Sequence, residues 1–306
     1  MKLMIFRYKY HDLTWIDMER PSHEEVRQIM EEFDIHPIVA DELLSPSLRP
    51  KVDHYENFIY LILHFPAIRH SHANNTQEVD FIIGQKFIIT VRYELLDPLH
   101  KFSKVFEVNS ILDKSDIGNH AGFLFFYMIR KIYSSLAREL SIIGESLKEI
   151  EDRIFKGQEK EMVEELSIIH RDLLAFHRAL RLHKPVLLSL GVECEEFFGH
   201  DFRHYTDNIV GEYYKVDELL QDQKEILSDL RITNDSLLSA KINEIMKLLT
   251  ATTFLMLPAT LISQIFSMNA LGKPIVNHPH GFWIILSTMM LVAMTTFFVF
   301  KRKGWL

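Results

Sequence analysis

The sequence predicts an α+β domain, arranged as an α/β/α sandwich, that continues through a long helical stalk into two C-terminal transmembrane helices. Three observations predict this fold class. Short runs rich in Ile, Phe and Val occur within roughly the first 115 residues, long runs with helical spacing follow, and two uncharged segments lie near the C-terminus. The mean hydropathy of zero therefore averages a polar N-terminal part and an apolar C-terminal part.

Composition excludes several classes of protein. The 34 basic and 42 acidic residues give a net charge of −8, which argues against a nucleic-acid polymer as the partner. The single cysteine, Cys194, rules out a disulfide framework and a cysteine-based zinc site. The first thirty residues carry Lys2, Arg7 and Lys9 without an apolar core, so we expect no signal peptide.

Residues 1–118 form the expected cytoplasmic α/β domain. Ser22 and Glu25 form a capping box after a proline and predict a helix that starts at residue 22, and a second short helix is expected over 41–44. The runs 58–65 and 81–91 predict strands, the second of them a hairpin that turns at Gly84-Gln85-Lys86.

Residues 119–200 have the pattern of long antiparallel helices. We expect helices over 119–155 and 159–189, separated by Lys156-Gly157 and closed by Gly191. Their acidic faces indicate either a solvated helix surface or a surface that attracts cations. The acidic residues are Glu145, Glu149, Glu151, Asp152, Glu159, Glu161, Glu164 and Glu165.

Residues 201–268 predict one helix, a stalk that continues into the first transmembrane span. The 21 residues 248–268 and the 19 residues 282–300 carry no charge, and each is close to the ~20 residues that cross a bilayer as a helix. The alternative, two buried helices of a soluble core, fits poorly with adjacent uncharged runs that are bounded by charge.

Basic residues predict the orientation of the spans. Lys241 and Lys247 precede the first span, and the basic tail 301–306 follows the second, whereas the connector 269–281 carries only Lys273. The positive-inside rule then predicts a multi-pass protein of the cell inner membrane, with both termini in the cytoplasm and the connector outside.

Polar residues form a stripe along the first span. One helical track carries Asn243, Thr250, Leu257 and Gln264, and a neighbouring track carries Thr253, Thr260 and Ser267. Three interpretations are open: hydroxyls that bond back to their own backbone, a dry interface between helices, or one wall of a pore. A pore requires a homo-oligomer, because two spans cannot enclose one, and the exposed amide of Gln264 favours it.

Six ordered fragments resemble the CorA family of divalent-cation (Mg²⁺/Co²⁺) channels, and the resemblance covers nearly the whole chain. The fragments are WID at 15–17, IHPIVADELL at 35–44, RPKVDHYENFIYLIL at 49–63, NEIMKLLT at 243–250, SMN at 267–269 and FKRKGWL at 300–306. The resemblance implies a homopentameric funnel in the lipid bilayer, with the first span lining the pore and the second facing lipid.

The resemblance also implies roles for pore residues. Ser267, Met268 and Asn269 match the family's Gly-Met-Asn selectivity filter with serine in place of glycine, and Asn269 would form a ring of amides around hydrated Mg²⁺. Asn243 would form an inner polar ring, and Met246 and Leu249 would form a hydrophobic constriction. Thr260 matches a further pore position, and Gln264 stands where the family usually has glycine. The expected pore lining is Asn243, Met246, Leu249, Thr250, Thr253, Leu257, Thr260 and Gln264.

Departures from the family concern regulation. Asp41 and Glu42 match an acidic pair that holds a regulatory Mg²⁺, but the matching stalk position is Ile232, which cannot bind a metal. Asp229 or Asp235, each within one helical turn of Ile232, could supply the carboxylate instead. The external loop carries Lys273, His278 and His280 and has no acidic residue to concentrate cations.

We therefore expect a channel for Mg²⁺, and for Co²⁺ or Ni²⁺, without enzymatic activity, since no Walker, GxSxG or HExxH motif is present. One alternative keeps the pore but gates it with a small-molecule cytoplasmic ligand such as a signalling nucleotide. A second alternative is Zn²⁺ transport.

Overall fold

The computed structural model describes residues 5–66, 76–93, 99, 120–268 and 279–303. The chain divides into two compact units, Met1–Leu230 and Arg231–Leu306, which are described separately. The long helix α7 (Arg203–Ser267) contributes to both units.

A six-stranded mixed sheet forms the centre of the first unit. The strand order is β1-β2-β6-β5-β4-β3, and of the pairs formed by these described strands only β2–β6 is parallel. The strands are β1 Ile5–Tyr10, β2 Leu13–Glu19, β3 Lys51–His54, β4 Phe58–Pro66, β5 Thr76–Gly84 and β6 Phe87–Arg92. Strands β4, β5 and β6 are buried on both faces; β4 and β6 are nearly continuous apolar runs, whereas β5 also buries the polar residues Gln77, Glu78 and Asp80.

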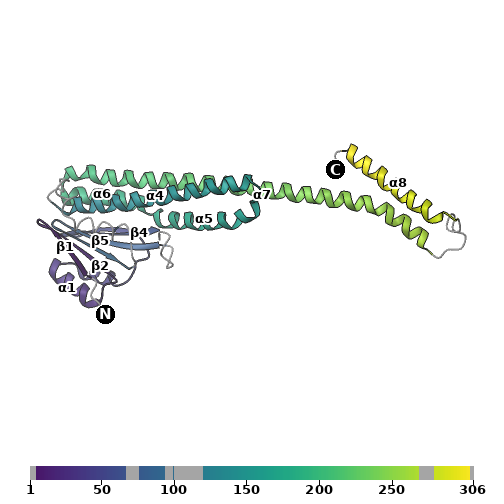
Figure 1. Cartoon of the computed structure of the whole chain (residues 1–306). Coiled ribbons are helices and arrows are strands. Elements are labelled where there is room, and N and C mark those ends of the chain that lie inside the picture. Colours follow the sequence, from purple (N-terminus) through teal and green to yellow (C-terminus); the bar gives the residue numbers. More distant parts are fainter. Residues whose placement is uncertain (1–4, 67–75, 94–98, 100–119, 269–278, 304–306) are drawn as a thin grey trace. The chain divides into compact units, whose positions relative to one another are not determined.

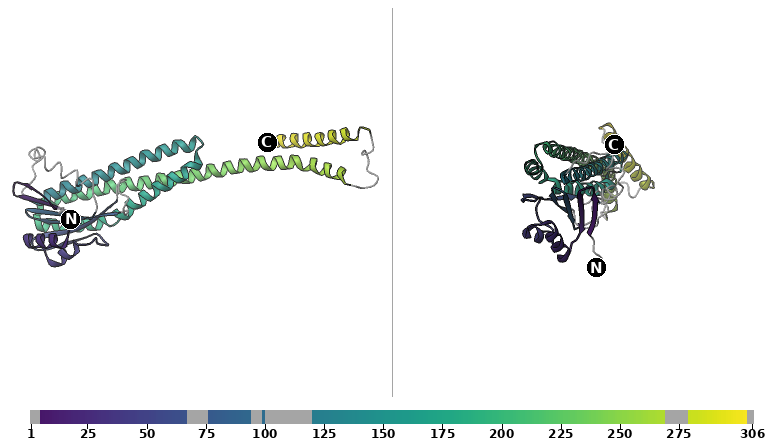
Figure 2. Two further views of the ribbon diagram at one scale, coloured as in Figure 1. Left: turned by 60° about the horizontal axis from the view of Figure 1, so that its bottom comes forward. Right: turned by 90° about the vertical axis from the view of Figure 1, so that its left-hand side faces the viewer.

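Helices cover both faces of this sheet and form the expected α/β/α sandwich. Helices α1 (His23–Phe33) and α2 (Pro37–Glu42) lie on one face, and α4 (Ala121–Phe155), α5 (Glu159–Leu180) and α6 (His183–Phe198) lie on the other (Figures 1 and 2). The core beneath α1 and α2 includes Val26, Ile29 and Val39 from the helices and Tyr60 and Ile89 from the strands.

The local predictions at α1 and at the hairpin are confirmed. Ser22 caps α1, and its backbone N–H donates to the Glu25 carboxylate at 2.7 Å, which completes the capping box. Strands β5 and β6 pair antiparallel through the two-residue turn Gln85-Lys86. A Cβ atom at position 84 would collide with the Phe87 ring, so a larger residue there would force that ring to move.

The expected helix over 41–44 is wrong in its bounds, since α2 begins four residues earlier at Pro37. His36 caps it by accepting a hydrogen bond from the Ile38 N–H at 3.3 Å, and Pro37 has a backbone angle already suited to the first helical position. The candidate pair Asp41 and Glu42 therefore lies in the last turn of α2 rather than in the first turn of a helix.

The expected single helix over 159–189 is also wrong, because it ends at Leu180 and α6 begins at His183. Pro185 lies in the first turn of α6, where its missing N–H costs nothing, whereas a continuous helix would lack that hydrogen bond. His183 is fully buried and fixes this start: its Nε2 lies 2.7 Å from the His64 backbone oxygen and its Nδ1 lies 2.7 Å from the Tyr133 hydroxyl. Gly191 lies within α6.

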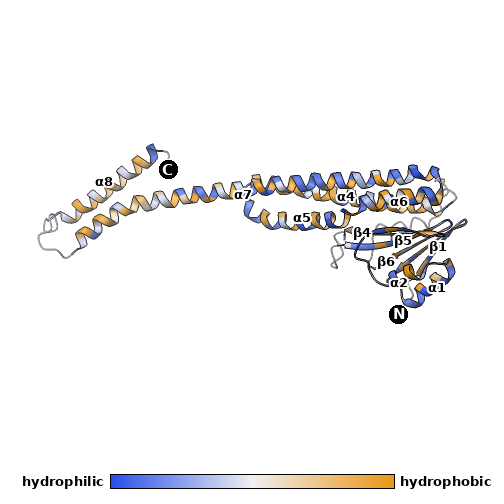
Figure 3. Ribbon diagram, turned by 180° about the vertical axis from the view of Figure 1, so that it is seen from behind, coloured by the Kyte–Doolittle hydropathy of each residue, from blue (hydrophilic) through white to orange (hydrophobic). Residues whose placement is uncertain are grey.

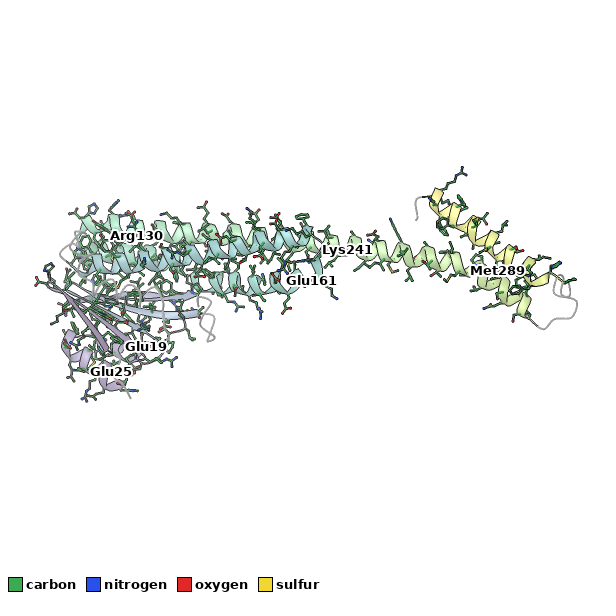
Figure 4. The ribbon with its side chains drawn as sticks, in the orientation of Figure 1. Glu19, Glu25, Arg130, Glu161, Lys241 and Met289 are labelled. Atoms are coloured by element: carbon green, nitrogen blue, oxygen red, sulfur yellow. The ribbon has the colours of Figure 1, made fainter. Side chains whose placement is uncertain are left out.

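Most of the acidic residues on α4 and α5 are exposed, as a solvated helix surface requires; Glu161 is one of them (Figure 4). Glu165 forms an ion pair with Arg153 at 2.7 Å and so links the two helices. Glu159 differs from the rest because it is buried at the start of α5.

Within the first unit, α7 packs alongside α4 through a regular apolar stripe. The buried positions Ile209, Tyr213, Val216 and Leu220 follow a spacing of four and three, which is typical of coiled-coil contacts. The Tyr133 and Tyr213 rings lie 6.3 Å apart, and Arg130 of α4 approaches Glu212 at 3.9 Å (Figure 4).

The motif at 15–17 forms part of a buried polar network between β2 and β6. The Trp15 indole N–H donates to Thr90 Oγ1 at 3.0 Å, and Thr90 donates to Asp17 at 2.8 Å. Arg92 contacts Asp17 at 3.1 Å and Glu19 at 3.1 Å, and its side chain is 3% exposed. These mutual contacts satisfy charges that would otherwise be costly to bury.

A second buried polar group lies on the face of the sheet beneath α2. Asp80 is fully buried, and its Oδ2 accepts a hydrogen bond from the Tyr60 hydroxyl at 3.1 Å. Its Oδ1 has no hydrogen-bond partner among the described residues. Burial, together with the neighbouring Glu78 carboxylate, raises the pKa of Asp80 well above its ordinary value.

We expect Asp80→Asn to stabilise the protein at neutral pH, by ~1–3 kcal/mol. The asparagine keeps an acceptor for Tyr60 and is neutral beside Glu78 without having to take up a proton on folding. Because the folded state raises the pKa of Asp80, its contribution to stability is complete below pH ~4 and is lost as the pH rises. Melting midpoints of the full chain in detergent between pH 4 and pH 8 measure the effect.

The advantage of the variant should therefore be small near pH 4 and grow toward pH 8. The exposed Asp12 provides a control, since Asp12→Asn should leave the midpoint unchanged at every pH. A destabilised Asp80→Asn protein at pH 8 would show that the charged form of Asp80 is needed by the fold.

Candidate functional site

The second unit contains two helices that are long and apolar enough to span a membrane. They are the C-terminal part of α7 and α8 (Gly281–Arg302), where apolar colouring dominates in Figure 3. Lys241 lies on α7 before the uncharged segment, and Met289 lies within α8 (Figure 4). Helix α7 continues through Pro258 and ends at Ser267, one residue before the predicted segment ends.

One face of α7 packs against α8. Within 241–268, the less exposed positions recur every three or four residues, and the rings of Phe254 and Phe300 lie 6.1 Å apart. These α7 positions are Ala251, Leu255, Pro258, Ala259, Ile262 and Phe266; the corresponding α8 positions are Gly281, Ile285, Met289, Val292, Ala293, Thr296 and Phe300. We call this contact the α7–α8 seam.

The predicted pore residues lie on the opposite face of α7. At about 100° per residue, their mean direction differs from that of the seam by roughly 180°. All of them are exposed: Asn243, Met246, Leu249, Thr250, Thr253, Leu257, Thr260 and Gln264. Helix α8 thus leaves this face free, including both hydrophobic residues of the expected constriction.

Some hydroxyls of the polar stripe are satisfied within the helix itself. Thr253 donates to the Leu249 carbonyl at 2.9 Å, and Thr260 donates to the Leu257 carbonyl at 2.9 Å. Hydroxyls that bond back to their own backbone are one of the three interpretations of the polar stripe. Each such hydroxyl oxygen still has lone pairs that can accept a hydrogen bond from water.

The described chain includes two of the three expected filter residues. Ser267 and Met268 are exposed at the end of α7, and the Met268 N–H donates to the Gln264 carbonyl at 3.1 Å. Asn269, Lys273 and His278 lie outside the described residues. His280 immediately precedes α8.

The candidate regulatory acids have different surroundings. Asp41 is exposed, whereas Glu42 lies 2.8 Å from the Lys51 ammonium, which also contacts Asp53 at 2.8 Å. Burial lowers the pKa of Lys51, but hydrogen bonds to Asp53 and Glu42 outweigh it and raise the pKa. Ile232 is 63% exposed, and both Asp229 and Asp235 are also exposed.

Sequence patterns did not reveal a polar surface pocket of about 760 Å³ in the first unit, which is widely open to solvent and is called the cavity below. Four acidic residues line it, together with one lysine, one histidine, two amides and three phenylalanines. The lining is Glu32, Phe33, Asp34, His54, Glu56, Asn57, Gln85, Lys86, Phe87, Glu196 and Phe197. These residues come from four separate stretches of chain, so no local sequence motif indicates that the cavity exists.

A family model described as "CorA-like Mg2+ transporter protein" matches residues 10–302. The chain belongs to the CorA family. CorA proteins are transporters rather than enzymes, and the two apolar C-terminal helices fit a membrane transporter.

Curated CorA relatives match along the whole chain. The cobalt/magnesium transport protein CorA of Methanocaldococcus jannaschii is 24% identical over 308 residues, covering 100% of this chain and 95% of the relative. The cobalt/magnesium transport protein CorA of Thermotoga maritima is 24% identical over 296 residues, covering 96% of this chain and 83% of the relative.

Solved structures confirm the CorA fold class. The complete CorA magnesium transporter of Methanocaldococcus jannaschii matches with a TM-score of 0.83 at 23% identity, covering 98% of this chain and 94% of that one. The full-length CmaX protein matches with a TM-score of 0.73 at 18% identity, covering 96% of this chain and 89% of that one.

Proposed function

We propose that this CorA protein forms a homopentameric channel that moves Mg²⁺ across the inner membrane. The polar face of α7 would line its pore. The observation that carries this proposal is the separation of the two faces of α7: α8 covers the seam, and the candidate pore residues stay exposed on the other side. An amide such as that of Gln264 would lose its hydrogen bonds if it faced lipid, whereas a water-filled pore would hydrate it.

The residues along this face fit a hydrated divalent cation as cargo. Mg²⁺ loses its water reluctantly, so side chains that accept hydrogen bonds from first-shell water can select it without stripping it. Asn243 and Gln264 offer such amides, and Asn269 is proposed to form the outer ring. Met246 and Leu249 bring apolar surface to the same face between the polar positions, as a gate that closes by dewetting requires. Co²⁺ and Ni²⁺ form hydrated divalent ions that the same face could admit.

Cysteine accessibility tests which face of α7 lines the pore. We expect a cationic methanethiosulfonate reagent to block Mg²⁺ flux into proteoliposomes through Thr253→Cys and Thr260→Cys. The seam variants Ala259→Cys and Ile262→Cys should react more slowly, by a factor on the order of ten or more, because α8 covers these positions.

The native chain provides a clean background for this experiment. Its one cysteine, Cys194, is buried, and burial raises the pKa of its thiol, so wild type should not respond to the reagent. Equal block from both faces, or block from the seam alone, would contradict the proposed pore lining.

The proposed membrane orientation puts both termini in the cytoplasm. Lys301, Arg302 and Lys303 end α8, and Lys241 and Lys247 precede the uncharged segment of α7. Basic residues at both of these ends favour the cytoplasmic side.

Regulation by cytoplasmic Mg²⁺ is proposed to be weak in wild type. Asp41 and Glu42 would bind the ion, but Lys51 already compensates the charge of Glu42, and Ile232 adds no ligand. We expect Ile232→Asp to strengthen Mg²⁺-dependent closure, since an added carboxylate is the ligand type that Mg²⁺ prefers. The measurement is flux against cytoplasmic Mg²⁺, and the expected change is a severalfold lower half-closing concentration.

The Ile232→Asn variant controls for the change in shape, because asparagine has the size and shape of aspartate without its charge. It should resemble wild type. If Asp41→Ala/Glu42→Ala and wild type close equally at low millimolar Mg²⁺, the regulatory site lies elsewhere. If Mg²⁺ closes neither wild type nor Ile232→Asp, gating by a different cytoplasmic ligand becomes the better hypothesis.

The cavity bears on that alternative. Its four carboxylates would repel the phosphates of a signalling nucleotide, and Lys86 is its one lysine. We therefore rank gating by a nucleotide below gating by Mg²⁺, and Zn²⁺ transport remains the third hypothesis.

A further inference from the structure

Among the described residues of the first unit, three metal-ligating side chains meet at the edge of the cavity. His54 ends strand β3, and Glu193 and Glu196 lie one turn apart on α6. One imidazole nitrogen and one carboxylate oxygen from each glutamate all lie within 4.8 Å of one another. Side chains three residues apart on a helix project from the same face, so both carboxylates can turn toward the strand.

Contacts from both elements hold His54 and Glu193 in place, whereas Glu196 is exposed. His54 Nδ1 lies 2.9 Å from Glu193 Oε2, and the His54 ring packs edge-on against Phe197 with centroids 5.7 Å apart. The Gln85 amide donates to the Phe197 carbonyl at 2.7 Å and fastens the end of α6 to the β5–β6 turn. The His54 and Glu193 side chains are only 25% and 30% exposed, which restricts their motion.

The charges at this position are not balanced within the group. Two carboxylates face one imidazole, and the adjoining cavity adds three further acids, Glu32, Asp34 and Glu56, against one lysine, Lys86. The cavity of about 760 Å³ also leaves room for the water molecules that would complete the coordination of a cation. The arrangement differs from a plain acidic surface because a directional nitrogen ligand converges with the oxygens.

We propose that His54, Glu193 and Glu196 bind a late first-row divalent cation, of the class of Zn²⁺, Co²⁺ and Ni²⁺. Imidazole suits these ions, and one histidine with two carboxylates is a ligand set that they accept, with positions left for water. Mg²⁺ prefers oxygen ligands in octahedral geometry, so it competes poorly for a site that includes a histidine. The site is separate from the candidate pore and from Asp41, and it does not depend on either.

A neighbouring histidine provides a matched control. His200 also contacts a glutamate of α6, Glu195, but Arg203 lies 2.7 Å from the same carboxylate. The guanidinium already supplies a positive charge there, and no second acid completes a group of three among the described residues. Both histidines therefore contact a glutamate of α6, but only His54 belongs to a group of three candidate ligands, and His200 is much more exposed.

The experiment is calorimetric titration of the full chain in detergent with Zn²⁺ and, separately, with Ni²⁺. Wild type should bind one more ion per chain than His54→Ala or Glu193→Gln/Glu196→Gln does. His200→Ala should keep the wild-type stoichiometry. The absorption spectrum of bound Co²⁺ provides a second readout, because loss of a nitrogen ligand changes its d–d bands, and Mg²⁺ should not displace the ion at equal concentration.

Thermal melting of each variant identifies any loss of fold, and His54→Gln keeps the bulk of the side chain if alanine destabilises the packing on Phe197. Equal stoichiometry and affinity in wild type and in the folded His54 variants would overturn the proposal. Equal losses in the His54 and His200 variants would also overturn it, since binding would then reflect surface histidines in general.

Discussion

Replacing Asn269 with alanine is expected to abolish Mg²⁺ flux while the oligomer still assembles. The proposed filter consists of five amide groups, one from each chain, that accept hydrogen bonds from the water around Mg²⁺. Alanine removes every one of these groups at once, and no neighbouring side chain of Ser267-Met268-Asn269 can replace an amide. Flux of Mg²⁺ into proteoliposomes should fall by at least about a hundredfold, since five coordinated contacts are lost together.

Size-exclusion chromatography in detergent separates loss of the filter from loss of assembly. Ser267→Gly provides a matched control in the same triplet: it restores the family pattern and should retain or increase flux. Normal Mg²⁺ uptake by Asn269→Ala would exclude the amide ring as the filter. An inactive Ser267→Gly channel would instead identify the serine hydroxyl as a pore group.

Replacing Arg92 with alanine is expected to cause the largest loss of stability in the first unit, ~3–5 kcal/mol. Arg92 donates to the buried Asp17 through Nε and Nη2 at 3.1–3.3 Å and contacts Glu19 through Nη1. Asp17 is 4% exposed, so alanine would leave a buried carboxylate without its cationic partner. The melting midpoint of the full chain should fall by about 6–20 °C.

The exposed pair of Arg7 and Glu32 provides the control for this prediction. Two hydrogen bonds of 2.6 and 2.7 Å join these side chains, but both are more than a third exposed. Water therefore screens their interaction, and Arg7→Ala should cost less than about 1 kcal/mol. If Arg92→Ala does not accumulate, Arg92→Lys can replace it, because lysine keeps the charge but loses the forked geometry of the guanidinium. Its melting midpoint should lie between those of Arg92→Ala and Arg7→Ala. Equal midpoints for Arg92→Ala and Arg7→Ala would show that burial does not strengthen the Arg92 network.

Features that depend on neighbours along the chain could be predicted from the sequence alone. The absence of charge over 248–268 and 282–300 predicted two spans, and the capping box at Ser22 predicted the start of α1. Helical periodicity alone separated the polar face of α7, because positions three and four residues apart always share a face. Six short fragments were enough to identify the CorA family, which the match over residues 10–302 confirms.

The contacts of those fragments depend on partners that are distant along the chain. In the motif at 15–17, Trp15 and Asp17 owe their burial to partners 73 to 75 residues away on β6, and no local pattern indicates that β2 and β6 pair in parallel. The break before α6 depends on His183, whose partner is the backbone of His64, 119 residues earlier. His54 and Glu193 meet across 139 residues in the same way.

The choice of which α7 face contacts α8 also needed coordinates, since both faces of that segment carry long apolar side chains. Periodicity records the geometry of a single helix or strand, whereas ion pairs, ligand groups and helix seams depend on which elements the fold brings together in space.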